Sequence, residues 1–174
     1  MMSLIAGESA IFTIFVVAYV FYIGKSLSGP TPRQVLEIPI AGTVCLLSSS
    51  FTIWLAERAI ALNRIKAFAT WLAATIALGV VFIVGTAREW HRLIYRDGLT
   101  ISTNLFGTTF YSLVGLHATH VVIGLAMLTA VLAFTMAGRV NQRHSERLAV
   151  LSLYWHFVDA VWVAVFSVVY LIGR

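Results

Sequence analysis

The sequence predicts an all-α integral membrane protein, a bundle of five helices that each cross the bilayer. Of its 174 residues 60% are hydrophobic and only 11% are charged, whereas a soluble domain carries roughly 25% charged residues. The apolar residues form long runs without strand-like alternation, and short charged joints separate the runs. Because only helices satisfy the backbone across lipid in such runs, we expect a single transmembrane domain over residues 1–174.

The five expected helices follow one another with short connections. No basic region precedes the first run, so it is interpreted as a retained helix and not as a cleavable signal. Pro39 suits the first turn of the second helix, where its missing N–H is not needed. The fourth run exceeds the ~20 residues that one hydrocarbon thickness requires, so it must tilt or extend into an aqueous layer. The expected helices are about 3–23, 39–62, 67–90, 104–136 and 147–172.

The charge pattern does not decide which end of the chain faces which side of the membrane. The net charge is +5, and the twelve Lys and Arg lie almost wholly between the apolar runs. That distribution is typical of loops that face lipid headgroups, not of a nucleic-acid-binding stripe. The six on the N-terminal side are Arg58, Arg64, Lys66, Arg139, Arg143 and Arg147, and the six on the other are Lys25, Arg33, Arg88, Arg92, Arg96 and Arg174. The two sides therefore carry equal numbers of basic residues, and the positive-inside rule assigns no orientation.

A few ionisable residues lie inside the apolar runs, where an unpaired charge is costly. Most other charged side chains, Arg58, Arg88 and Glu89 among them, lie near helix ends and can extend to the interface. The histidines of the fourth helix, and the histidine and aspartate of the fifth, are each three residues apart and so share a helix face. The buried set is Glu8, His117, His120, His156 and Asp159.

Three interpretations of this set remain open. Imidazole with carboxylate suits several metals, but neither the usual spacing of membrane haem ligands nor a His-Glu-x-x-His motif is present. An intramembrane carboxylate can mark an ion pathway, yet no inverted repeat or broken helix is visible. The third interpretation is that these groups bond to each other or to a partner subunit. Hydroxyl partners are offered by Ser48, Ser49, Ser50 and Thr52, and close helix approach by Gly115, Ala118, Thr119 and Gly124.

Six motifs in order along the chain together resemble subunit III of the haem-copper oxidases. The most recognisable is the last helix, with Tyr-Trp-His-Phe-Val-Asp at 154–159 followed by Val161 and Trp162. The others are G-x-H-x-x-H-V-x-x-G at 115–124, the segments 99–102 and 106–110, Ala-Arg-Glu-Trp at 87–90, the serine run 48–52, and Glu8 with Ile11 and Phe12. The resemblance covers nearly the whole chain.

The resemblance implies a non-catalytic subunit III of a proton-pumping terminal oxidase of the cytochrome c oxidase type, acting in aerobic respiration. Such a subunit packs on subunit I, beside subunit II, and supports proton uptake and stability during oxygen reduction. The chain itself would hold no redox centre and no metal; haem and copper belong to the partner subunits, and phospholipid could bind. The family places the N-terminus in the cytoplasm and the C-terminus in the periplasm, and the short form points to a bacterial plasma membrane.

Two other functions remain as alternatives. One is an accessory subunit of the same fold in a quinol oxidase or a nitric oxide reductase system. The other, more distant, is a free-standing transporter. The electron donor, the haem type and any supercomplex are set by other subunits.

Some positions depart from the family pattern. The long form of the family has seven helices, so the phospholipid cleft that its first two helices line is in doubt here. A glutamate that often lies seven residues before His156 is replaced by Ala149, and Glu146 is the nearest carboxylate that could take its role.

The resemblance also places Glu8 where the family carries a carbodiimide-reactive glutamate. We expect Glu8, His117 and His120 to form one buried polar group, and His156 with Asp159 to form a second or to extend the first. Either would serve packing or proton uptake. The candidates for contact with other subunits or with lipid are Trp155, Trp162, Glu89 and Trp90.

Overall fold

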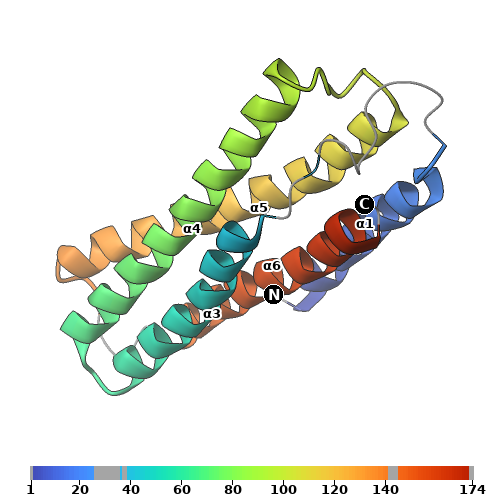
Figure 1. The fold of residues 1–174 in the computed structure, drawn as a ribbon. Coiled ribbons are helices and arrows are strands. Elements are labelled where there is room, and N and C mark those ends of the chain that lie inside the picture. Colours follow the sequence, from blue (N-terminus) through green and yellow to red (C-terminus); the bar gives the residue numbers. More distant parts are fainter. Residues whose placement is uncertain (1, 26–35, 37–38, 141–144, 173–174) are drawn as a thin grey trace. The chain divides into compact units, whose positions relative to one another are not determined.

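The computed structural model describes residues 2–25, 36, 39–140 and 145–172, and the regular elements among them are all helical. The elements are α1 (Met2–Tyr22), α3 (Ile40–Ala61), α4 (Ile65–Tyr95), α5 (Leu105–Met136) and α6 (Ser145–Phe166), which continues into the π-helical segment η2 (Ser167–Ile172) (Figure 1). Five of the described helices are long and apolar enough to cross a membrane. The all-α prediction is therefore confirmed. Arg33, Arg143 and Arg174 lie outside the described residues.

The predicted bounds hold closely for α1, α3 and α5 but are wrong for α4. This helix was expected to end near residue 90 and instead runs to Tyr95. Arg92 and its neighbours were interpreted as a loop because they are charged, yet Leu93 in the same turn is fully buried and holds the turn in place. The helix is followed by Gly98, whose φ of 64° is a backbone conformation that glycine adopts readily. Charge at the membrane edge thus marks the end of the lipid span and not the end of the helix.

The chain groups into two compact units. Unit 1 comprises Met1–Pro39, Gly85–Thr119 and Ala160–Arg174, and unit 2 comprises Ile40–Val84 and His120–Asp159. The boundary between them falls within α4, α5 and α6. The single-domain organisation stays a prediction.

Unit 2 is built around Trp155 of α6, whose side chain is 0% exposed. The ring packs against glycines on two other helices. A Cβ added to Gly124 of α5 would lie 2.8 Å from the indole ring, and one added to Gly79 of α4 would lie 3.1 Å from it. The indole Nε1 donates a hydrogen bond to Ser49 Oγ of α3, at 2.8 Å. Glycine allows this approach because it has no side chain, and the expected role of Gly124 is confirmed.

The connection between α3 and α4 is a tight turn within unit 2 (Figure 1). Asn63 adopts a φ of 57°, in the left-handed region that asparagine tolerates better than most residues. The Arg64 amide donates to the Ala59 carbonyl at 2.8 Å and the Asn63 amide to the Ile60 carbonyl at 2.9 Å. These are the two bonds of a Schellman cap, which satisfies the last carbonyls of α3. The two helices therefore form a hairpin.

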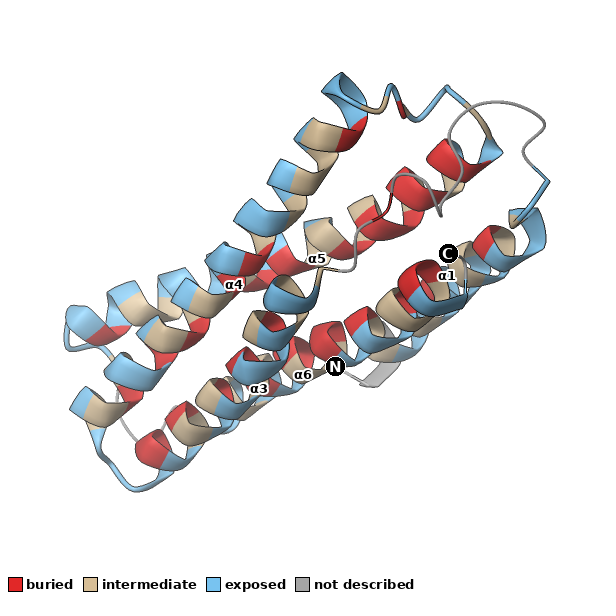
Figure 2. Ribbon diagram, viewed as in Figure 1, coloured by how far each residue is buried: buried red, intermediate tan, exposed pale blue. Residues whose placement is uncertain are grey.

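Unit 1 contains α1, the end of α4, the start of α5 and the end of α6 with η2. α1 contacts η2, and its buried side chains Phe12 and Tyr19 face inward. The loop after α4 is fixed by Tyr111, whose hydroxyl donates to the Leu99 carbonyl at 2.8 Å. Much of the remaining helix surface is exposed (Figure 2), and many of the exposed side chains are large and apolar. Such surfaces are stable only against lipid or another subunit.

Cations near two helix ends lie over aromatic rings. The Arg58 guanidinium lies 3.8 Å from the centre of the Trp54 ring, and Lys25 Nζ lies 3.3 Å from the centre of the Phe21 ring. An amphipathic side chain that covers an apolar ring while its charge reaches water is typical of a membrane interface.

The packing of Trp155 predicts that Gly124→Ala lowers the stability of the fold. The new methyl group would meet the indole at 2.8 Å, and overpacking of this kind costs about 1–3 kcal/mol. The measurement is the midpoint of thermal unfolding in mild detergent. Gly85→Ala is the matched control, because a Cβ there meets nothing within 4 Å. Equal midpoints for the two variants would contradict a tight glycine–indole contact.

Candidate functional site

Ser50 joins the histidine and the aspartate of α6 within unit 2. Its hydroxyl donates a hydrogen bond to Asp159 Oδ2 and lies 3.0 Å from His156 Nδ1. A serine hydroxyl carries one proton. When Asp159 is ionised and accepts that proton, the bond between Ser50 and His156 is donated by Nδ1–H of the imidazole. We call Ser50, His156 and Asp159 the Ser50 cluster.

Asp159 is the deepest member of the Ser50 cluster and is 3% exposed. Its Oδ2 is bonded to Ser50, whereas its Oδ1 is buried without a hydrogen-bond partner among the described residues. A carboxylate in an apolar interior is stable only if it holds a proton or lies near a positive charge. Within the cluster, His156 is the group that can exchange a proton with it through Ser50.

The serine run of α3 supplies hydroxyl partners at two successive positions. Ser50 binds the α6 pair, and Ser49 accepts the indole hydrogen bond of Trp155 at 2.8 Å while donating to the Leu46 carbonyl at 2.5 Å. Two residues after Ser50, the Thr52 hydroxyl bonds to the Thr75 hydroxyl of α4 at 2.8 Å. The expectation that the serine run provides polar partners is confirmed. These bonds join α3 to α6 and to α4 inside unit 2.

His117 belongs to unit 1 and lies among aromatic rings. Its side chain is fully buried. The ring centre lies 4.9 Å from that of Trp162 at an angle of 30°, and 6.4 Å from that of Phe12, which approaches edge-on. Glu8 and His120 are both half-buried. The expected polar group of Glu8, His117 and His120 stays a prediction.

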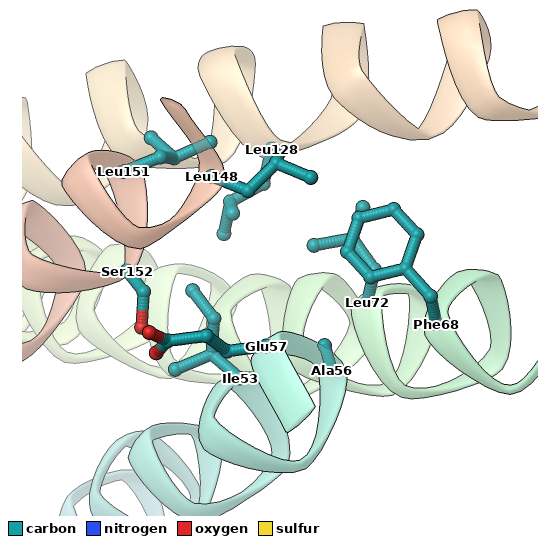
Figure 3. A pocket seen from close by; sticks show the side chains of 9 residues that line it. All are labelled: Ile53, Ala56, Glu57, Phe68, Leu72, Leu128, Leu148, Leu151 and Ser152. Carbon is teal, nitrogen blue, oxygen red and sulfur yellow. The ribbon is translucent and has the colours of Figure 1, made fainter. Parts of the chain in front are cut away.

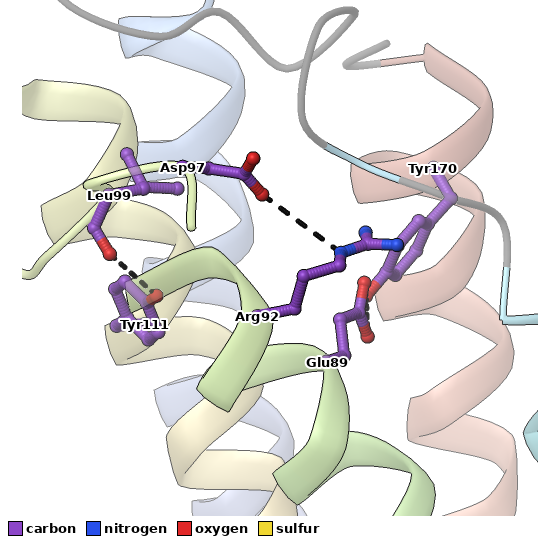
Figure 4. Close-up of polar contacts among 6 residues, drawn as sticks. All are labelled: Glu89, Arg92, Asp97, Leu99, Tyr111 and Tyr170. Carbon is purple, nitrogen blue, oxygen red and sulfur yellow. Dashed lines mark hydrogen bonds and ion pairs between the residues drawn. The ribbon is translucent and has the colours of Figure 1, made fainter. Parts of the chain in front are cut away.

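Glu89 of α4 has a specific partner within unit 1. The buried hydroxyl of Tyr170, in η2, lies 3.1 Å from each carboxylate oxygen of Glu89 and donates to it. Figure 4 shows the Arg92 side chain reaching toward the same pair, while its Nε forms an ion pair with Asp97 Oδ2 at 4.0 Å. The interpretation of Glu89 as a residue that simply extends to the interface is therefore incomplete. No spacing signal could reveal this bond, because 81 residues separate its ends.

The prediction that Trp155 and Trp162 contact lipid or other subunits is wrong. Trp155 is enclosed by α3, α4 and α5 within unit 2, and Trp162 packs on His117, Phe166 and Tyr170 within unit 1. Both side chains are buried. Trp90 is half-buried and packs edge-on against Tyr111, with ring centres 5.4 Å apart. Tryptophan is common at membrane interfaces, and for that reason the sequence alone suggested the wrong environment.

The polar groups of the described residues do not assemble into a metal-binding arrangement. Within that part of the chain, no three residues among His, Cys, Asp and Glu gather so that they could hold a metal ion. What the Ser50 cluster can do chemically is hold and pass a proton, because it combines an imidazole, a hydroxyl and a buried carboxyl group. Fold and site together define a helical membrane protein with buried polar clusters.

Comparison with known proteins identifies the family. The family model for cytochrome c oxidase subunit III matches residues 8–174. The chain is 35% identical to cytochrome c oxidase subunit 3 of Alkalihalophilus pseudofirmus, over 97% of this chain and 83% of the relative. It is 36% identical to cytochrome c oxidase subunit 3 of Synechocystis, over 97% of this chain and 72% of that relative. It is 33% identical to cytochrome bo(3) ubiquinol oxidase subunit 3 of Pseudomonas aeruginosa, over 95% of this chain and 80% of that relative.

The chain belongs to the cytochrome c oxidase subunit III family and is a subunit III of a haem-copper oxidase. The resemblance seen in the sequence is thereby confirmed. It follows that the chain is a membrane protein and one component of a multi-subunit oxidase complex.

The Ser50 cluster predicts that Ser50→Ala destabilises the fold. The change removes the hydroxyl shared by His156 and Asp159, and leaving buried polar groups unsatisfied costs about 1–3 kcal/mol. Thermal unfolding in detergent measures the effect. Ser167→Ala is the control, because that exposed hydroxyl only bonds back to the Val163 carbonyl of its own helix. A Ser50→Ala midpoint no lower than that of the control would argue against a structural bond.

The hydrogen bond from Tyr170 of η2 to Glu89 of α4 predicts that Tyr170→Phe also lowers the stability of the fold. The variant keeps the ring but removes the donor from Glu89, and a hydrogen bond to a charged group contributes about 1.5–3 kcal/mol. Local opening of the C-terminal segment can be followed by amide hydrogen exchange, which we expect to become faster in η2. Tyr95→Phe serves for comparison, since Tyr95 is 76% exposed. Unchanged exchange in η2 would show that packing alone holds this segment.

Proposed function

We propose that this subunit III packs on the haem-copper subunit of a bacterial plasma-membrane oxidase and supports its proton uptake and its stability during turnover. Subunit II is the expected second partner. The proposal is supported by family membership and by the abundance of exposed apolar side chains on the described helices. Haem and copper would lie in the partner subunits, and the activity of the complex would be proton-pumping oxygen reduction.

The electron donor that we propose is cytochrome c. Relatives with names of this type match at 35% and 36% identity. A quinol is the second candidate, because a ubiquinol oxidase subunit 3 matches at 33% and a quinol oxidase subunit 3 at 29%. The donor would be bound by another subunit of the complex.

The N-terminus is proposed to lie in the cytoplasm and the C-terminus in the periplasm. With α1 entering from the cytoplasm, the hairpin between α3 and α4 would also face the cytoplasm. The family's orientation supports this proposal, whereas the basic residues do not decide it, since they are equal in number on the two sides, with Arg58, Arg64 and Lys66 at this hairpin. Cysteine labelling from either side of spheroplasts would test it at Asn63, which is exposed.

The test of the proposed assembly is purification of the tagged chain in mild detergent. We expect a larger haem- and copper-containing chain to remain bound, and the preparation to consume oxygen with reduced cytochrome c. Oxygen consumption with ubiquinol but not with cytochrome c would support the second candidate. Recovery of the chain alone, from cells that respire normally through a separate oxidase complex, would refute the assembly.

A role in sustaining turnover predicts a particular phenotype for Glu8→Gln. The haem absorption spectrum should not change, because no haem ligand is removed, whereas oxygen consumption should decay faster during continuous turnover. Arg96→Gln is the control, since it also removes one charge, from an exposed side chain to which no role is assigned. An altered haem spectrum in Glu8→Gln, or a decay identical to that of the control, would count against the role.

A further inference from the structure

A small cavity in unit 2 lies about one helical turn from the Ser50 cluster, since its lining residues Ile53 and Ser152 are three and four residues from Ser50 and His156. Its walls come from α3, α4, α5 and α6, and are apolar except for the Glu57 carboxylate and the Ser152 hydroxyl (Figure 3). The space open to the centre of a water molecule is about 10 Å³, close to the ~10–15 Å³ that one bound water needs. Water is therefore the occupant that fits, because an organic ligand would be far too large.

Ser152 gives an independent indication that something polar binds there. Its side chain is 2% exposed, and its hydroxyl has no hydrogen-bond partner among the described residues. Buried hydroxyl groups are nearly always hydrogen-bonded, to protein or to ordered water. Figure 3 shows the Ser152 hydroxyl and the Glu57 carboxylate on the same side of the cavity. A water between them would satisfy both.

The helical spacing aligns these two residues with the Ser50 cluster. Ser152, His156 and Asp159 lie at positions i, i+4 and i+7 of α6, which share one face. Ser50 and Glu57 lie seven residues apart on α3 and also share a face. His156 follows Ser152 by one turn of α6, so along that helix it is the member of the Ser50 cluster nearest the cavity. All five residues belong to unit 2.

We propose that these five residues and one water form a line that carries a proton from Glu57, at the edge of the span, to Asp159 in the interior. Glu57 passes a proton to the water that Ser152 anchors, and the water passes one to His156 Nε2. His156 releases its Nδ1 proton to Ser50 Oγ, and the original Ser50 proton moves to Asp159 Oδ2. One proton leaves Glu57 and one arrives at Asp159, so no other reactant is needed.

This line deepens the proposed support of proton uptake and rests on it for its direction. In the proposed orientation, Glu57 lies beside the cytoplasmic hairpin, from which an oxidase draws protons. Asp159 ends the line as a carboxyl group that stores the proton. Its unpartnered Oδ1 and its deep burial favour the protonated form.

The test follows hydrogen–deuterium exchange at the Asp159 carboxyl group by infrared spectroscopy, on the chain as purified with its partners. We expect a protonated-carboxyl C=O band that disappears in Asp159→Asn and shifts after transfer to D₂O. Ser152→Ala and Glu57→Gln should each slow that shift by about tenfold, the rate change that about 1.36 kcal/mol produces. Ser152→Thr, which keeps the hydroxyl, should restore the original rate.

Thr75→Val is the matched control, because it also removes a buried hydroxyl of unit 2, one that bonds to Thr52 and not to the line. Its exchange rate should equal that of the unaltered chain. Absence of any band assigned to Asp159 would overturn the proposal, as would equal rates in Ser152→Ala, Glu57→Gln and Thr75→Val. These outcomes are independent of oxygen consumption and of which chains co-purify, so failure of the line and failure of the proposed assembly are distinguishable.

Discussion

The packing of one indole ring determines how unit 2 is put together. Trp155 is enclosed because glycines on α4 and α5 leave room for it and a serine on α3 accepts its N–H. In a bilayer the hydrophobic effect contributes little to association between helices, since lipid tails are as apolar as the side chains. Close van der Waals contact and a satisfied N–H must hold the helices together instead. A single large side chain from α6 provides both toward three neighbouring helices.

The same low-polarity surroundings explain why the remaining polar groups are few and grouped. Ser50 binds His156 and Asp159 together, and Tyr170 binds both oxygens of Glu89. In each case a neutral hydroxyl group donates a hydrogen bond to a carboxyl group. Burying that carboxyl group without a partner would cost free energy. This arrangement lets the chain keep ionisable groups inside a helix bundle. The Ser50 cluster is the group of this kind on which the proposed proton line depends.

Much of the fold could be predicted because lipid imposes a simple rule on the sequence: runs of apolar residues become helices. The grouping of His156 with Asp159 and a serine could be anticipated from helical spacing and from the cost of a bare carboxylate. The extension of α4 could not, since Arg92 is compatible with both a helix and a loop. The Tyr170–Glu89 bond depends on tertiary packing between distant segments, and the burial of Trp155 depends on glycines of α4 and α5. Neither the Tyr170–Glu89 bond nor the burial of Trp155 can be inferred from the residues that neighbour them in the sequence.

The Schellman cap at Asn63 has a consequence for how the protein is made. Only residues 62–64 separate α3 from α4, which is too few for either helix to cross the bilayer while the other stays behind. The pair must therefore leave the translocon as one inserted hairpin. Its polar tip carries Arg64, and Lys66 follows at the start of α4, so these basic side chains lie at the same membrane face. Correct topology of this segment during biogenesis is thus tied to a three-residue turn and not to later subunit assembly.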